Sequence, residues 1–419
     1  MIADPLIYIR GVHLGATLLA CGTTAFLVLV AEPAGTKLRA DFAVLRYELT
    51  ILIWAALAVA ILSGAAWLAL LASDILGTSL ADVCLHGGAW PVLVDTRFGL
   101  VWCVRLAFAL LLGVLIHWPA TRGWQVAVAG ALTTLPALIG HAGATPGLSG
   151  DVHLVSDMMH LLAAGAWLGG LPAFAWLMSQ TRRARKPAWS DFAIRSTHRF
   201  SVIGILGVGI LLASGLVNSW YLLSGAGDLL TTDYGQLVAF KIGLFAAMVA
   251  IAMVNRFYLT PRLPGAPALR ALQRNSLAEI ALGLCVLLVV GMLGTLPPAA
   301  HKHLAPEGIP PDAAFVHIHS VEAMADVMIN PGRPGQPQIT IRVSREDLSH
   351  FPAKDVYLSL EPPGRGRHPV GQDAVEQADG TWLVNGIALT EPGIWTVRVF
   401  VTPERGEPIP LDARIVIEP

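Results

Sequence analysis

The chain has 419 residues, of which 54% are hydrophobic and only 14% are charged, and its mean hydropathy is +0.61. This composition is far more apolar than that of soluble globular proteins of similar length, so it excludes that class and indicates a membrane protein. The formal net charge is −1, and we expect membrane lipid around the chain and no nucleic-acid partner.

Apolar segments long enough to cross about 30 Å of hydrocarbon recur along the first 298 residues. They cover roughly residues 6–31, 43–72, 98–117, 124–141, 152–179, 200–223, 235–258 and 275–297. The first has no basic segment before it and no cleavage site of small residues, which favours a retained span over a signal peptide. We predict a polytopic α-helical membrane domain with about eight transmembrane helices over residues 1–298.

Lysine and arginine are unequally distributed between the connections of these spans. The odd-numbered connections hold Lys37, Arg39, Arg46, Arg122, Arg182, Arg183, Arg185, Lys186, Arg195, Arg199, Arg256, Arg262, Arg270 and Arg274. The even-numbered connections hold Arg97. Because positive charge favours the cytoplasmic side, we expect the odd-numbered connections in the cytoplasm and both chain termini outside.

The composition changes after Pro297-Pro298. Residues 299–312 form a Pro-rich linker, and residues 313–419 alternate apolar and polar positions in short runs. These runs are Ala325 to Ile329, Gln338 to Val343, Asp355 to Leu360, Thr381 to Leu389, Trp395 to Val401 and Ala413 to Ile417. The pattern predicts an Ig-like all-β sandwich of about 100 residues, which follows the eighth span and is therefore expected in the periplasm.

The fifth apolar segment begins with three ionisable side chains, His153, Asp157 and His160. Steps of three or four residues lead from these through Ala164 to Trp167, so one helix face carries all five. An ionisable group inside hydrocarbon is expensive and marks a candidate functional site. The alternative interpretation is a structural ion pair of Asp157 that locks the helices together.

Eleven of the 13 histidines fall on the predicted outer side. They are His13, His86, His141, His153, His160, His301, His303, His317, His319, His350 and His368. Imidazole is a preferred ligand of copper, zinc and nickel. We therefore predict an outward-facing metal site made of His13, His141, His153, Asp157 and His160, with His317 and His319 of the sandwich as further ligands. The alternative interpretation of His141 and His153, each taken alone, is a solvated side chain at the membrane interface.

Three basic residues inside the predicted spans need partners within the bundle, because lipid does not solvate them. They are Arg10, Arg105 and Lys241. One arrangement pairs Asp157 with one of these three and leaves the imidazoles free as ligands. In a metal site, Arg105 and Lys241 would orient the carboxylate or act as a gate.

Several segments of the membrane region occur in a characteristic order. They are Asp95-Thr-Arg-Phe-Gly-Leu-Val-Trp102-Cys-Val-Arg105, Gly140-His141-Ala, Asp157-Met-Met-His160-Leu-Leu-Ala-Ala-Gly-Ala-Trp167-Leu-Gly-Gly-Leu, Thr232-Asp-Tyr234-Gly-Gln-Leu-Val-Ala-Phe-Lys241 and Asn255-Arg256. Over about residues 5–298 the chain resembles the copper resistance protein D (CopD) family of bacterial inner-membrane proteins. The tail, with His317-Ile-His319 and Pro392-Gly-Ile-Trp395, is similar to FixH-like or YtkA-like β-sandwich domains.

The resemblance implies copper handling at the inner membrane, as uptake from the periplasm into the cytoplasm or as a part of copper homeostasis. It also implies a periplasmic copper-binding partner of the CopC type, separate or fused to the N-terminus. This chain carries its sandwich at the C-terminus instead.

We predict that copper passes to the outer site, where Asp157 offsets its charge, and that binding weakens below about pH 6 because the imidazoles become protonated. The inner half of the spans offers few copper ligands. Two alternatives therefore remain open: copper binding, sensing or delivery to a cuproenzyme without transport, and haem-binding electron transfer with paired histidines such as His13 and His160. We expect no enzymatic activity, because no nucleophile and base stand in a supporting motif.

Overall fold

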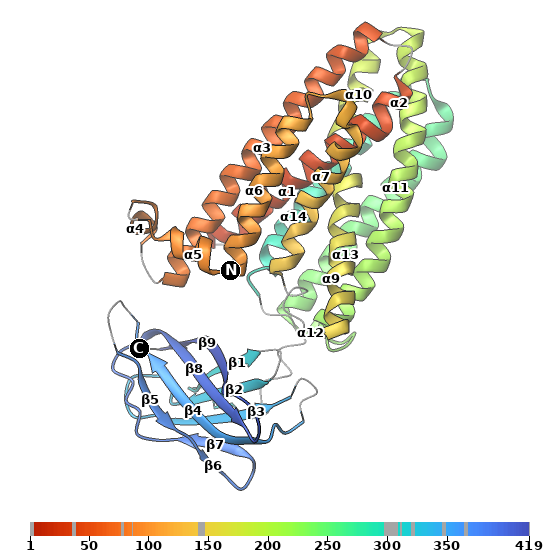
Figure 1. The fold of residues 1–419 in the computed structure, drawn as a ribbon. Coiled ribbons are helices and arrows are strands. Elements are labelled where there is room, and N and C mark those ends of the chain that lie inside the picture. Colours follow the sequence, from red (N-terminus) through yellow and green to blue (C-terminus); the bar gives the residue numbers. More distant parts are fainter. Residues whose placement is uncertain are drawn as a thin grey trace. The chain divides into compact units, whose positions relative to one another are not determined.

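The structure is a computed structural model and describes residues 4–35, 39–76, 79–85, 87–140, 147–296, 309–310, 312–319, 323–345, 349–363 and 368–418. The chain divides into two compact units, Met1–Ala299 and Ala300–Pro419. The first unit is helical and the second is built of strands (Figure 1). Each unit is described below by itself.

The helices of the first unit follow one another with short connections. They are α1 (Pro5–Ala25), the π-helical η1 (Phe26–Ala31), α2 (Glu32–Ala34), α3 (Arg39–Leu76), α4 (Leu80–Leu85), α5 (Ala89–Asp95), α6 (Arg97–Leu115), η2 (Pro119–Thr121), α7 (Arg122–Thr134), η3 (Leu135–Ile139), α9 (Gly147–Trp167), α10 (Leu171–Ala184), α11 (Pro187–Leu222), α12 (Asp228–Thr231), α13 (Asp233–Val254), the π-helical η4 (Asn255–Leu259), η5 (Thr260–Arg262) and α14 (Ala266–Leu293).

Seven helical segments in the described part of the chain are long and apolar enough to cross a membrane. The predicted fourth span, 124–141, is the 13-residue α7 followed by the five-residue 3₁₀ turn η3. Pro136 lacks an N–H, so the α-helix ends just before it. At 1.5 and 2.0 Å per residue the two pieces together still extend about 30 Å. The prediction of a polytopic helical domain is confirmed, with seven helices of spanning length where about eight were expected.

The fifth predicted span is interrupted at Gly169-Gly170, between α9 and α10. A Cβ at Gly169 would overlap the carbonyl oxygen of Leu18 in α1, and a Cβ at Gly22 of α1 would overlap the backbone of Gly169. The two backbones therefore approach more closely than any side chain permits. This contact fixes α1 against the end of α9, which carries the candidate site.

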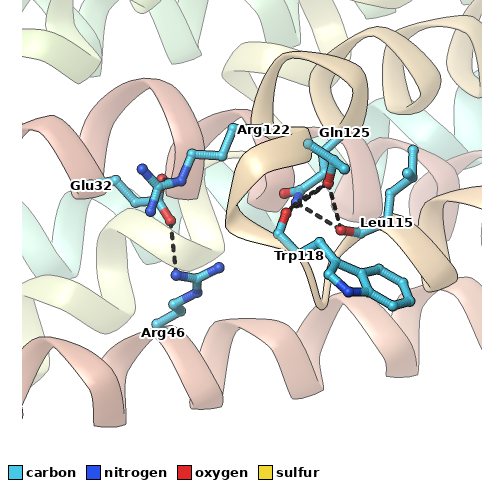
Figure 2. A network of polar contacts seen from close by, with 7 residues as sticks. Glu32, Arg46, Leu115, Trp118, Arg122 and Gln125 are labelled. Atoms are coloured by element: carbon cyan, nitrogen blue, oxygen red, sulfur yellow. Dashed lines mark hydrogen bonds and ion pairs between the residues drawn. The ribbon is translucent and has the colours of Figure 1, made fainter.

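Basic and polar side chains join the odd-numbered connections at one end of the bundle. Glu32 of α2 pairs with Arg122 of α7 and, over 3.5 Å, with Arg46 of α3 (Figure 2). In the same view, the Gln125 amide donates to the carbonyl oxygens of Leu115 (2.9 Å) and Trp118 (3.1 Å), which tie α6 to α7.

The remaining odd-numbered connections join the same end. Arg195 of α11 donates to the Ala34 carbonyl oxygen over 2.9 Å, and Arg182 of α10 donates to Gln273 of α14. We call this the basic end of the bundle. The positively charged connections therefore meet where their charges are shared with carbonyl oxygens and one buried carboxylate.

The second unit is a sandwich of two antiparallel sheets, which confirms the predicted all-β domain. One sheet has the order β1-β2-β3-β7-β6 and the other β5-β4-β8-β9. The strands are β1 (Ala314–His319), β2 (Met324–Asn330), β3 (Gln338–Ser344), β4 (Ala353–Glu361), β5 (Val370–Asp373), β6 (Val375–Glu376), β7 (Thr381–Val384), β8 (Gly393–Pro403) and β9 (Ile409–Ile417). The inward positions of both sheets form one core around the fully buried Trp395.

The run predicted over Thr381 to Leu389 is a strand only as far as Val384. Gly386 has φ of +90°, a conformation that an extended strand does not contain. The chain therefore leaves the sheet after Val384 and still buries Ile387 and Leu389 in the core.

Candidate functional site

A cavity of about 450 Å³ lies among α9, α11, α13 and α14. Its wall is mostly apolar, which is typical of sites that take a small ligand and use a few polar groups to fix it. The ionisable and amide side chains that line it are His153, Asp157, His160, Asn218, Tyr234 and Lys241. We call it the outer cavity, because these residues lie toward the ends of the helices that the sequence places outside.

The α9 face that the helical spacing predicts lines this cavity. His153, Asp157, His160, Ala164 and Trp167 all contribute to its wall. The segment forms a helix of 21 residues, so steps of three and four bring every member to the same side. The polar groups of the fifth span therefore face a space inside the protein.

His160 is held by a hydrogen bond that leaves one ring nitrogen open. Its Nδ1 lies 2.9 Å from the Ser214 hydroxyl oxygen, which lies 2.6 Å from the carbonyl oxygen of Ile210. Since the hydroxyl donates its proton to that carbonyl, it accepts from His160, and the imidazole proton sits on Nδ1. The Nε2 lone pair is then available, the arrangement found in metal-binding histidines oriented by a second group.

Asp157 and Lys241 bring opposite charges to the same cavity. Asp157 Oδ1 accepts from the Asn218 amide over 3.2 Å. The ammonium of Lys241, from α13, interacts electrostatically with this carboxylate, although no ion pair within 4.0 Å joins the two in the described residues. Of the three basic partners predicted for Asp157, Lys241 is the one that shares its cavity.

His153 lines the outer cavity and is only 3% exposed. Its ring stacks on Tyr221 of α11 at 4.5 Å and an interplanar angle of 8°. Its Nδ1 is buried and finds no hydrogen-bond partner among the described residues. A buried donor or acceptor of this kind requires a water or a ligand.

His13 is engaged differently from the other predicted ligands. Its Nδ1 lies 2.9 Å from the Ala60 carbonyl oxygen, so it carries the proton, and its Nε2 accepts from Arg105 over 2.6 Å. Arg105, which is 2% exposed, also donates to the Leu132 carbonyl oxygen (2.9 Å) and to Thr17 (3.2 Å). His13 thus has no free lone pair in this arrangement, and a pairing of His13 with His160 on one haem iron would first break the bond to Arg105.

The other residues predicted for the site lie elsewhere. Arg10 donates to the Gly294 carbonyl oxygen and covers the Trp67 ring at 5.2 Å. His317 Nδ1 lies 2.5 Å from Asp326 Oδ1 on the neighbouring strand of the sandwich. His141 and the side chain of His319 fall outside the part of the chain that the structure describes.

The cavity supplies fewer ligands than a complete metal site needs. No group of three His, Cys, Asp or Glu side chains in the described residues is arranged to hold an ion. Asp157 and His160 are three residues apart on one helix, which places their Cβ atoms about 5–6 Å apart. They could supply two ligands to one ion, and a complete metal site needs a third donor as well.

Two residues that matter to the membrane domain are absent from the sequence-based prediction. Ser214 fixes His160, and Glu279 is a fully buried carboxyl in α14. An acidic residue within an apolar span is the signal that singled out Asp157, and it would have found Glu279. A serine in a span gives no comparable signal.

Comparison with known proteins identifies the family of the membrane domain. The sequence profile of the family Copper resistance protein D matches residues 194–293, and that of the Copper resistance protein D-like N-terminal domain matches residues 1–151. The chain is 31% identical to the inner membrane protein YebZ of Escherichia coli (strain K12) over 308 residues, which cover 71% of this chain and 100% of that protein.

Two further relatives are more distant. The chain is 26% identical to the copper transport protein CutJ of Bacillus subtilis (strain 168), over 75% of this chain and 59% of that protein. It is 29% identical to copper resistance protein D of Pseudomonas syringae pv. tomato, over 49% of this chain and 71% of that protein. No solved structure matches the chain. With one relative matched over its whole length and two family profiles matched in order along the membrane domain, the chain belongs to the copper resistance protein D family.

Proposed function

We propose that the protein carries copper across the bacterial inner membrane, from the periplasm to the cytoplasm, and catalyses no chemical reaction. The observation that carries this proposal is the outer cavity, which collects His153, Asp157, His160 and Lys241 from two helices. Names of two relatives, a copper transport protein and a copper resistance protein, agree with it.

The chemistry of the cavity suits a transient copper site. His160 Nε2 offers a lone pair and Asp157 offers negative charge, and imidazole is a preferred copper ligand. Lys241 lies on the same cavity, so a cation that binds Asp157 has to compete with its ammonium for the carboxylate. Such competition weakens binding, and a carrier must release its ion.

The orientation completes the proposal. The basic end lies in the cytoplasm by the charge rule for membrane proteins. The outer cavity and the C-terminal sandwich then face the periplasm, where a CopC-type protein or the histidines of the sandwich deliver copper. If copper were bound and handed to a cuproenzyme without transport, the same cavity would bind the ion and cellular copper would not change.

The deciding experiment measures copper in cells by mass spectrometry, and metal bound to the purified protein. We expect the intact protein to raise cellular copper and the double variant Asp157→Ala with His160→Ala to lose this increase. The matched control, Asp191→Ala with His198→Ala, removes the same residue types from exposed positions of α11 and should behave as the intact protein. Equal copper accumulation and equal bound metal in all three proteins would reject the proposal.

A further inference from the structure

A second cavity, of about 210 Å³, lies among α10, α11, η4 and α14. Its polar lining residues are Thr197, Ser201, Asn255, Arg256, Thr260, Ser276 and Glu279. Asn255 and Arg256 begin the π-helical η4 near the basic end, and π-helical turns are often found at functional sites. We call this the inner cavity.

Glu279 is 1% exposed and reaches this cavity from the middle of α14. Its Oε2 accepts from the Asn255 side-chain amide over 3.1 Å, and the Asn255 Oδ1 of the same amide accepts from the Asn275 side chain over 2.7 Å. The second bond fixes which way the Asn255 amide points. Glu279 Oε1 is buried and has no hydrogen-bond partner among the described residues, and the same holds for Thr197 Oγ1.

The two cavities follow each other along the same helices. Three helices line both cavities: α11, α13 with its continuation η4, and α14. Along each of them, the residues that line the outer cavity lie on one side of Trp167, and the residues that line the inner cavity lie on the other side. Among the described residues, Trp167 alone lines both cavities. It is 3% exposed and packs edge-on against Phe245 at 6.2 Å between ring centres. The inner cavity therefore continues the line of the outer cavity toward the basic end.

The donor set of the inner cavity does not suit copper(I) or cations that need several oxygen ligands. Copper(I) prefers thiolate, thioether or imidazole, and among the described lining residues Met253 is the one that offers such a donor. The other polar atoms are oxygens and amide, indole or guanidinium nitrogens. Calcium and magnesium need about six oxygen ligands, and no group of three acidic, His or Cys side chains exists in the described residues. A single carboxyl with one free oxygen can hold a proton.

The charged groups packed around Glu279 do not neutralise it. Arg256 lines the cavity, yet no ion pair within 4.0 Å joins it to Glu279 in the described residues. Arg182 of α10 binds Gln273, and Arg195 and Arg199 of α11 bind the carbonyl oxygens of Ala34 and Leu29. A carboxylate without a cation is costly in an apolar environment, and uptake of a proton removes that cost.

We propose that Glu279 Oε1 is a proton-binding site that exchanges with the solution at the basic end through the inner cavity. The carboxylate gains a proton to become a carboxylic acid, and release reverses this step. An exchange of this proton for copper rests on the proposed function. The existence of the proton site does not rest on it.

The proton site is tested without copper, by infrared difference spectroscopy of the purified protein in lipid nanodiscs at stepped pH. We expect a carbonyl stretch of a protonated carboxylic acid that changes with pH and is lost in Glu279→Gln. The matched control is Glu48→Gln, because the Glu48 carboxylate accepts bonds from Trp176 (2.8 Å) and Gln180 (3.0 Å) and so is partnered. It should keep the band.

Three results would overturn the proposal: no such band in the unaltered protein, the same band in Glu279→Gln, or a band that follows sodium concentration at constant pH. Retention of folding in Glu279→Gln is checked by its elution as one species and by an unchanged circular dichroism spectrum. The exchange with copper is tested separately in proteoliposomes, where a pH gradient should change copper entry in the unaltered protein and not in Glu279→Gln. A protein that shows the band and moves no copper would reject the proposed function and keep the proton site.

Discussion

At the scale of single residues, the partner of a buried histidine decides what the ring can do. His13 and His160 are both held inside the bundle, and each carries its proton on Nδ1 by the geometry of its hydrogen bonds. Arg105 then takes the remaining lone pair of His13, whereas no described side chain takes that of His160. Identical residue types thus have a structural role at one position and, in the proposed function, a ligand role at the other.

The role of Ser214 can be tested by removing its hydroxyl. In Ser214→Ala the His160 ring loses the group that orients it, and loss of such a supporting group usually weakens metal binding 10–100-fold. We expect a weakening of this size in a copper titration of the purified protein. Ser219→Ala is the matched control, because Ser219 lies on the same helix as Ser214 and lines the outer cavity. Equal affinities in the two variants would show that Ser214 does not position the ligand.

At the scale of elements, the break between α9 and α10 positions the site. Gly22 and Gly169 let α1 and the end of α9 touch backbone to backbone. The chain turns there and continues as α10, which leaves Trp167 at the level where the two cavities meet. A change at this contact should therefore affect stability and transport together.

Gly169→Ala tests the contact, because the new methyl group would overlap the Leu18 carbonyl oxygen. Overpacking of this kind costs about 1–3 kcal/mol, and we expect a lower midpoint of thermal unfolding in detergent. Gly209→Ala is the control: it lies within α11 and its new methyl group would meet nothing within 4 Å. Alanine favours a helix over glycine, so Gly209→Ala should match or exceed the unaltered protein. An unchanged midpoint in Gly169→Ala would show that α1 and α9 can move apart without loss of stability.

At the scale of the whole molecule, patterns that repeat along the chain could be predicted and partners across it could not. Apolar length predicted the membrane domain, period-two alternation predicted the sandwich, and helical spacing predicted the shared face of His153, Asp157 and His160. The bond between His13 and Arg105 joins residues 92 positions apart, and no local pattern encodes it. The sequence signal for Glu279 is a single acidic residue in an apolar helix. Its cavity, however, depends on how α10, α11, α13 and η4 pack around α14.

The orientation on which the direction of transport depends can be tested by thiol labelling of spheroplasts. Cys84 is exposed in the second connection, so a membrane-impermeant maleimide should label it from outside. In a Cys84→Ser background, Glu404→Cys in the turn between β8 and β9 should also be labelled from outside. Arg185→Cys, at the basic end, should react only after the membrane is permeabilised. The reverse pattern would place the outer cavity in the cytoplasm, and the proposed carrier would then load copper inside the cell and export it.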